Sequence, residues 1–128
     1  MPVEFPPVHV PRPYALPSTA LAARVEVPTE DGAAIVAWTY APEGVVDAPG
    51  TPFGIDLATP PVLMLHGNGE EHGIFGPVID AVCASGRAVI ALDSRAQGQS
   101  TRGAARPLTY ELMAADAIEA CARLGVPE

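Results

Sequence analysis

The stretch PVLMLHGNGEEHG, residues 61–73, places a polar turn directly after an apolar run. The run at 62–65 is short and continuous, which is typical of a strand that is buried on both faces of a sheet. The turn at 66–69 reads His-Gly-Asn-Gly, and burial requires none of these residue types. Glycine permits sharp backbone turns, and asparagine tolerates unusual φ angles. The stretch therefore predicts a strand that delivers a polar turn to the end of a sheet.

Helix and strand patterns alternate downstream of this turn. The first predicted helix, 75–86, ends at a glycine, and its expected core side chains are Val78, Ile79, Val82 and Cys83. Residues 88–92 form a second strand of the doubly buried kind. The second predicted helix, 108–125, has Thr109 as its N-cap, and its buried side is expected to include Leu112, Ala115, Ile118 and Ala122. This order predicts parallel strands joined by right-handed crossovers, with ligands bound beyond their carboxyl ends.

The N-terminal part of the chain has a different pattern. Residues 21–28 and 33–42 are two β-type runs separated by Thr-Glu-Asp-Gly, which predicts an antiparallel hairpin. Trp38 and Tyr40 fall on one face of the second run, where we expect them in the core or in a pocket wall. Six prolines within residues 1–20 predict an extended arm, and the folded domain is expected to occupy residues 21–128.

Composition limits the class of protein. A chain of 128 residues with 48% hydrophobic content can form the core of one soluble domain. The net charge of -8, with only 7 basic side chains, argues against a nucleic-acid partner. No apolar run approaches the ~18 residues that cross a bilayer, and no signal peptide is recognisable, so a cytoplasmic protein without membrane contact is expected. Cys83 and Cys121 are expected to be reduced thiols without a metal.

Three ligand chemistries can be tested against the turn. A dinucleotide fingerprint is not favoured, because the third glycine comes one residue late and Glu70 and Glu71 would repel a pyrophosphate. A mononucleotide loop would need a lysine, which the turn lacks. Glu70, Glu71 and His72 indicate a metal site only weakly, and His72 is more typical of a surface or helix-start side chain. We therefore expect neither a metal nor an organic cofactor.

An oxyanion hole suits the turn better. The backbone N–H that follows His-Gly can stabilise the negative charge of a tetrahedral intermediate, and one such donor is typically worth about 10²–10³ in rate. Gly67 and Gly69 would allow the turn, and His66 is expected to fix it through a side-chain hydrogen bond rather than to transfer protons. Structural roles are also favoured for Asp93, as a cap, and for Ser100, which lacks the surroundings of a nucleophile.

Three features together resemble the α/β-hydrolase fold family from about residue 21 onward. They are the hairpin, the segment VLMLHGNGE and the segment ALDSRAQGQS, residues 91–100, which matches the family's DxRGxGxS loop. The resemblance implies an α/β fold: the N-terminal part of the family's sheet, with a hairpin and two parallel strands joined through crossover helices, left incomplete. It also implies that Asn68 supplies the oxyanion N–H, and that a second loop shapes the pocket floor and braces neighbouring turns through Asp93, Arg95 and Ser100. Ala96 stands where the family usually has glycine.

The family's nucleophile belongs to a GxSxG elbow, and no serine of the 128 residues is flanked in this way. No histidine follows Ser100 to act as its base, because the three histidines are at positions 9, 66 and 72. We therefore expect the N-terminal part of a serine-type hydrolase that acts on a small ester or amide by acyl transfer and is inactive alone. The alternative is a non-catalytic fragment or binding module. It would dock on a second chain, or on a second copy, through an open edge expected at the last parallel strand, 88–92.

Overall fold

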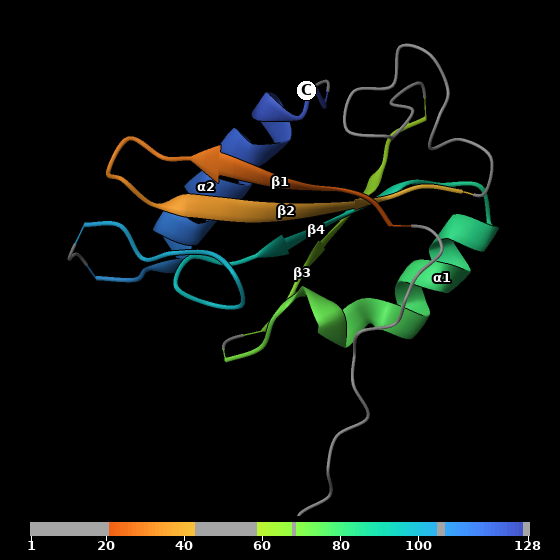
Figure 1. The fold of residues 1–128 in the computed structure, drawn as a ribbon, viewed down its shortest axis with the longest axis horizontal. Coiled ribbons are helices and arrows are strands. Elements are labelled where there is room, and N and C mark those ends of the chain that lie inside the picture. The colour runs from red at the N-terminus through yellow and green to blue at the C-terminus, as the bar shows by residue number, and fades with distance from the viewer. Residues whose placement is uncertain (1–20, 43–58, 68, 105–106, 127–128) are drawn as a thin grey trace, which may run out of the picture.

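The computed structural model describes residues 21–42, 59–67, 69–104 and 107–126. These residues form a four-stranded open sheet in the order β1-β2-β4-β3 (Figure 1). The strands are β1 (Leu21–Pro28), β2 (Ala34–Tyr40), β3 (Val62–Leu65) and β4 (Val89–Asp93). β2 is antiparallel to both β1 and β4, whereas β3 and β4 are parallel. The predicted α/β class, with a hairpin followed by two parallel strands, is confirmed.

The hairpin forms where the Asp-Gly pair predicted it. Gly32 adopts a φ of +85°, a conformation that glycine reaches without steric cost. Thr29 closes the turn, since its hydroxyl donates to Asp31 at 2.6 Å and accepts from the Ala33 N–H at 2.9 Å. The proline-rich arm expected at residues 1–20 lies outside the described residues.

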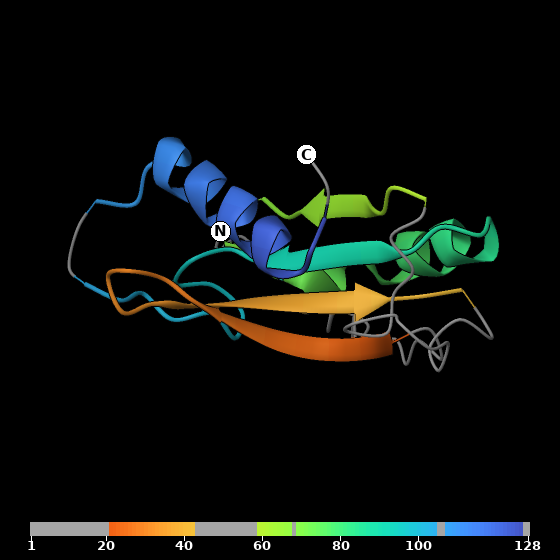
Figure 2. The same ribbon diagram turned by 90° about the horizontal axis from the view of Figure 1, so that it is seen from above.

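Two helices cover opposite faces of the sheet. Helix α2 (Tyr110–Arg123) packs on the face that carries Ile35, Ile90 and Leu92. Helix α1 (Gly76–Ala84), preceded by the short 3₁₀ helix η2 (His72–Phe75), packs on the other face, with a core of Tyr40, Met64, Ile79, Cys83, Val89 and Ala91. Figures 1 and 2 show the two helices well apart, toward opposite ends of the sheet. Trp38 packs beside Tyr40, as their spacing predicted.

The predicted helix faces need correction. In α1, Ile79 and Cys83 are buried as expected, but Val78 is 51% exposed. In α2, the N-cap is confirmed because the Thr109 side chain accepts from the Leu112 N–H. Of the predicted buried side, Leu112 is confirmed, but Ala115, Ile118 and Ala122 are exposed, Ile118 by 72%. The buried residues of the helix are Leu112, Asp116, Ala117 and Ala120. Asp116 lies on the buried face because it pairs with the buried Arg95. A prediction from hydrophobicity alone does not place an aspartate on the buried face of a helix.

The expectation that residues 62–65 are buried on both faces is wrong. Met64 is buried, but Leu63 and Leu65 are 40% and 52% exposed. The reason is the strand order, since β3 is the last strand of the sheet and α2 covers β2 and β4 instead. The open edge was expected at 88–92, and this is also wrong, because β4 lies between β2 and β3. Within the described residues, the edge of the parallel part of the sheet is β3 (Figure 1).

Cys83 in α1 and Cys121 in α2 are both free thiols, as predicted. Burial raises the pKa of each thiol, which keeps both protonated and poorly reactive at neutral pH. Neither α1 nor α2 combines the length and the hydropathy that a membrane span requires.

Candidate functional site

The segments that follow β3 and β4 meet at one edge of the sheet, because the two strands are parallel. Two hydrogen bonds connect them. The Ser94 N–H donates to His66 Nε2 at 2.9 Å, and the Gly69 N–H donates to the side-chain oxygen of Gln97 at 2.7 Å. The other ring nitrogen, His66 Nδ1, lies 2.6 Å from the Gly67 carbonyl oxygen, so a neutral ring with its hydrogen on Nδ1 satisfies both contacts. His66 thus ties the two segments together.

The loop at 67–70 closes on itself. The Gly67 N–H donates to the Glu70 carboxylate at 2.9 Å, and the Glu70 N–H donates to the Gly67 carbonyl at 3.2 Å. Gly69 adopts a φ of +80°, as the glycine at this position permits. Asn68, to which the sequence assigned the oxyanion N–H, lies outside the described residues.

Asp93 anchors both segments from the end of β4. Its side chain is fully buried and accepts four hydrogen bonds: from the His72 backbone and ring, from Trp38 Nε1 and from the Gln99 N–H, at 2.8–3.1 Å. Burial opposes ionisation, but these donors outweigh it and hold the pKa of Asp93 well below its ordinary value. Asp93 is therefore a carboxylate at neutral pH whose oxygens are fully occupied within the protein.

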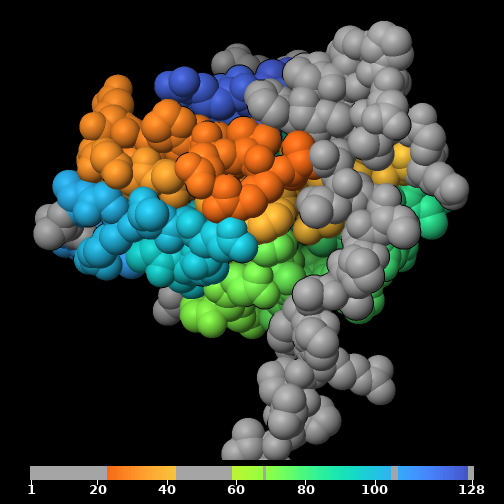
Figure 3. Space-filling view, in the orientation of Figure 1, coloured from red at the N-terminus to blue at the C-terminus, as the bar shows by residue number. Residues whose placement is uncertain are grey.

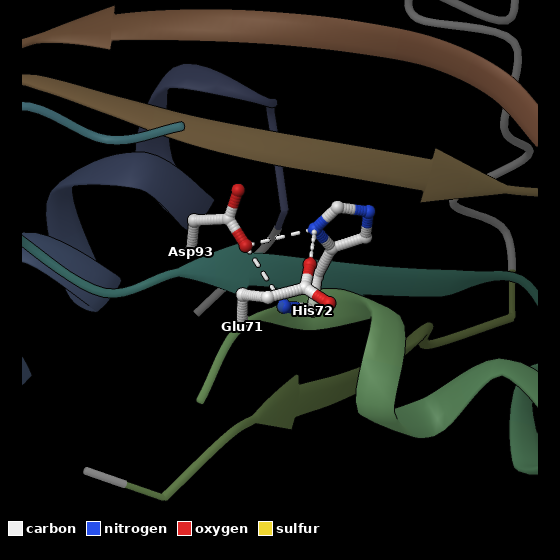
Figure 4. A group of neighbouring side chains, drawn as sticks. All are labelled: Glu71, His72 and Asp93. Atoms are coloured by element: carbon white, nitrogen blue, oxygen red, sulfur yellow. Dashed lines mark hydrogen bonds and ion pairs between the residues drawn. The ribbon is translucent and has the colours of Figure 1, made fainter. Parts of the chain in front are cut away.

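His72 lies at the start of η2, but its side chain is only 16% exposed and so does not lie on the surface. Its ring stacks on Trp38 with the centroids 4.1 Å apart. Nδ1 lies 2.8 Å from Asp93 Oδ1 and 2.9 Å from Glu71 Oε2 (Figure 4). In the described part of the chain, Glu71, His72 and Asp93 form the one group whose donor atoms lie close enough to hold a metal ion. The same three atoms already satisfy one another through the Nδ1 hydrogen, which accounts for the cluster without an ion.

Arg95 braces three parts of the chain. Its buried guanidinium makes a bidentate pair with Asp116 of α2 at 2.8 and 2.9 Å, and it contacts Asp31 of the hairpin turn at 2.6 Å. A further bond reaches the Arg102 carbonyl at 3.2 Å. The hydrogen bonds with Asp116 raise the pKa of Arg95 above its already high ordinary value. The sequence analysis missed both Asp116 and Asp31 as partners of Arg95. Asp116 could have been found, because it lies four residues after Leu112 and so on the same face of the predicted amphipathic helix.

Ser100 joins the segment after β4 to the hairpin. Its hydroxyl donates to the Asp93 carbonyl at 2.5 Å and accepts from the Val36 N–H at 2.8 Å. Thr101 extends the contact through hydrogen bonds with Ala34, and Figure 3 shows this segment, in cyan, against the hairpin, in orange. Both hydrogen-bonding directions of the Ser100 hydroxyl are therefore used inside the protein.

Ala96 keeps the turn that a glycine would make without strain. Its φ is +64°, and it is the one non-glycine residue with positive φ in the described part of the chain. For an alanine, this conformation costs about 1–2 kcal/mol. An alanine at this position therefore adds strain to the turn.

An open groove of about 820 Å³ adjoins these loops. Its walls come from the carboxyl ends of β3 and β4 and from the first turns of α2, and they include His66, Gly67, Ser94, Gln97, Tyr110 and Met113. Three of these residues, His66, Ser94 and Gln97, take part in the hydrogen bonds between the two loops. The groove therefore lies where a ligand of a parallel sheet is expected to bind.

The comparisons with known proteins agree with this architecture. A sequence model of the α/β hydrolase fold family matches residues 60–128, more than half of the chain, and the chain therefore belongs to that family. Among solved structures, a probable hydrolytic enzyme from Pseudomonas aeruginosa PAO1 superposes with a TM-score of 0.60 at 23% identity. The match covers 81% of this chain and 30% of that enzyme, so the chain spans less than a third of its length. At this identity the likeness shows the fold alone, and no curated protein matches the sequence significantly.

Proposed function

We propose that this chain is the N-terminal part of a serine-type hydrolase that cleaves small ester-like or amide-like substrates, and that it supplies the oxyanion loop. The observation that carries the proposal is the match of residues 60–128, which include the turn after β3, to the α/β hydrolase fold family. The N–H groups of Gly67, Gly69 and Glu70 all have acceptors inside the protein and hold this turn in shape. The resemblance of the turn at 66–69 to the family's HGxG loop assigns the oxyanion donor to the Asn68 amide.

The proposed reaction is acyl transfer. A serine hydroxyl, from a nucleophile elbow that these 128 residues do not contain, attacks the substrate carbonyl while a histidine accepts its proton. The carbonyl oxygen becomes an oxyanion, which the Asn68 N–H and a second N–H from the elbow stabilise. The leaving group departs with the proton, and water then hydrolyses the acyl-enzyme. His66, Gly67 and Gly69 hold the loop, and Asp93, Arg95 and Ser100 hold the floor beneath it.

No step of this reaction uses a metal or an organic cofactor. A cytoplasmic location is part of the proposal, because free cysteines such as Cys83 and Cys121 are typical of a reducing compartment.

The first experiment is to sequence the DNA beyond the codon for Glu128 and to assay the protein that the complete reading frame encodes. We expect a GxSxG elbow downstream, hydrolysis of p-nitrophenyl esters by that protein, and little or no hydrolysis by the 128 residues alone. Serine-dependent turnover by the purified 128-residue chain would contradict the proposal that the nucleophilic serine lies outside these 128 residues.

A matched pair of variants tests the oxyanion donor in the same protein. Asn68→Pro removes the backbone N–H and is expected to lower kcat about 10²–10³-fold, whereas Asn68→Ala retains the N–H and should lose far less. Equal losses in the two variants would point to the Asn68 side chain instead of its main chain.

A second candidate function is docking through the open edge of β3, without catalysis. The observation in its favour is the exposure of Leu63 and Leu65, at 40% and 52%, on an edge strand whose outer side has no partner among the described residues. Such an edge can add a strand from another chain or from a second copy. Sedimentation velocity distinguishes the candidates: concentration-dependent association of the 128-residue chain that Leu65→Lys abolishes favours docking, and a monomer at all concentrations argues against it.

A further inference from the structure

The two loops of the site exchange hydrogen bonds in a reciprocal way. After β3, the His66 side chain accepts from the backbone of the other loop, at Ser94. After β4, the Gln97 side chain accepts from the backbone of the first loop, at Gly69. Each bond joins residues that are 28 apart in sequence, so the two bonds together hold the two loops in one fixed alignment.

In the hydrogen bond between Gln97 and Gly69, Gln97 is the residue held more firmly by its surroundings. Its own backbone lies in a tight turn, with its N–H donating to the Ser94 carbonyl at 2.9 Å and its carbonyl accepting from the Ser100 N–H at 3.0 Å. Its side chain is half-buried and lines the groove. Gly69 is exposed and has a φ of +80°. The geometry therefore makes Gln97 the support and Gly69 the supported residue.

The chemistry of the side chain also suits this position. A glutamine oxygen accepts the Gly69 N–H without adding a charge, whereas the loop already contains the Glu70 carboxylate, which accepts the Gly67 N–H. A second carboxylate beside the proposed oxyanion would destabilise the developing negative charge. An uncharged acceptor avoids that repulsion and still occupies the Gly69 N–H, so that this N–H does not compete as a donor.

We propose that Gln97 is a positioning residue for the reaction: it holds Gly69, and with it the loop that carries the oxyanion donor, against the segment after β4. The catalytic part of this inference rests on the proposed function. In this proposal Gln97 acts through its hydrogen bond with Gly69 and not on the reacting atoms. Its contribution is expected in kcat, because a misplaced donor weakens transition-state stabilisation more than substrate binding.

The first arm of the test is spectroscopic and uses the 128-residue chain. Gln97→Met keeps the length of the side chain but removes the acceptor, and it should raise the hydrogen-exchange rate of the Gly69 amide about 2- to 10-fold. Gln97→Glu keeps an acceptor oxygen and should preserve the protection. Gln99→Met is the matched control, since the Gln99 side chain accepts from Arg24 of β1 instead, at 2.7 Å. A Gly69 amide that exchanges equally fast in wild type and Gln97→Met overturns the proposal.

The second arm measures ester hydrolysis by the protein of the complete reading frame. Gln97→Met should lower kcat about tenfold with KM nearly unchanged, and Gln99→Met should resemble the wild type. Loss of Gly69 protection with an unchanged kcat overturns the positioning role and leaves the hydrolase function intact. If the wild type hydrolyses no ester, the proposed function fails together with the catalytic role of Gln97, while the first arm still reports separately whether the contact with Gly69 exists.

Discussion

The two loops at the carboxyl ends of the parallel strands are built differently. The segment after β4 is held by buried groups: the Arg95 guanidinium, the Asp93 carboxylate and the Ser100 hydroxyl each have at least two partners. The loop after β3 is largely exposed and is held by a few bonds that involve side chains, chiefly those of His66, Gln97 and Glu70. The difference suggests a rigid platform that supports a more adaptable loop. This arrangement suits the proposed site, in which a backbone donor is held in place while a substrate enters.

The largest expected effect on stability comes from removing the charge of Arg95, which holds the segment after β4. Arg95→Met leaves Asp116 and Asp31 without their buried partner and should lower the free energy of unfolding by about 3–5 kcal/mol. Urea denaturation followed by circular dichroism measures it. Arg123→Met is the matched control, because Arg123 makes an exposed pair with Glu119 on the same helix, where the loss should be at most about 0.5 kcal/mol. Similar losses in the two variants would show that the platform does not depend on Arg95.

A comparison of two glycines tests the contrast between the loops directly. A Cβ at Gly98 would lie 2.4 Å from the Asp93 carboxyl carbon, at a φ of +54°. Gly98→Ala should therefore destabilise the protein by about 3 kcal/mol, through strain and overpacking together. A Cβ at Gly69 meets nothing within 4 Å, so Gly69→Ala should lose only the roughly 1 kcal/mol of its positive φ of +80°. Thermal unfolding measures both losses of stability. Equal losses in Gly98→Ala and Gly69→Ala would show that the segment after β4 is not packed more tightly than the loop after β3.

Acid should weaken the platform through Asp93. Because the folded-state pKa of Asp93 is lowered, its contribution is fully present above its unfolded pKa of about 3.9 and is lost as the pH falls toward the folded value. We expect the urea midpoint of the wild type to fall steeply below about pH 4. Asp93→Asn should be less stable at pH 7 and should show a shallower decline in this acid range. An equally steep decline in Asp93→Asn would assign the acid sensitivity to other carboxylates.

The smallest expected effect is a gain in stability. Ala96→Gly relieves the positive φ of +64°, worth about 1–2 kcal/mol, but adds freedom to the unfolded chain, so a net gain of about 0.5 kcal/mol is expected. Differential scanning calorimetry can detect the corresponding rise in Tm. Ala104→Gly, in the same segment but without a positive φ, should lower Tm slightly. A lower Tm in Ala96→Gly would show that the turn is not strained.

Much of the fold could be predicted because local patterns determine it. The Asp-Gly turn, the apolar runs and the Thr109 cap act over a few residues, and the structure has each element close to its predicted position. Burial was harder to predict, because it depends on which strands are neighbours. The run at 62–65 has the composition of a central strand, yet β3 lies at the edge of the sheet and leaves Leu65 exposed. Ile118 was misplaced for a related reason, since the buried pair of Asp116 with Arg95 orients α2.

The site was predictable in outline, but its internal contacts were not. Motif spacing predicted that the turn at 66–69 and the segment at 93–100 lie at one end of the sheet, and family membership agrees with that motif-based reading. No local signal indicated that Gln97 would bond to Gly69, or that His72 would stack on Trp38 and bond to Asp93. These contacts join segments that lie far apart along the chain.

By itself, the amino-acid sequence determined the elements of this protein, their order and the family to which they belong. These follow from turn chemistry, hydrophobic period and motif spacing, which act locally along the chain. Only the tertiary structure decided which strand forms the edge, which face of α2 is buried and which side chains hold the two loops together. Those outcomes depend on distances between residues far apart in sequence, and such distances are set when the sheet and its helices assemble.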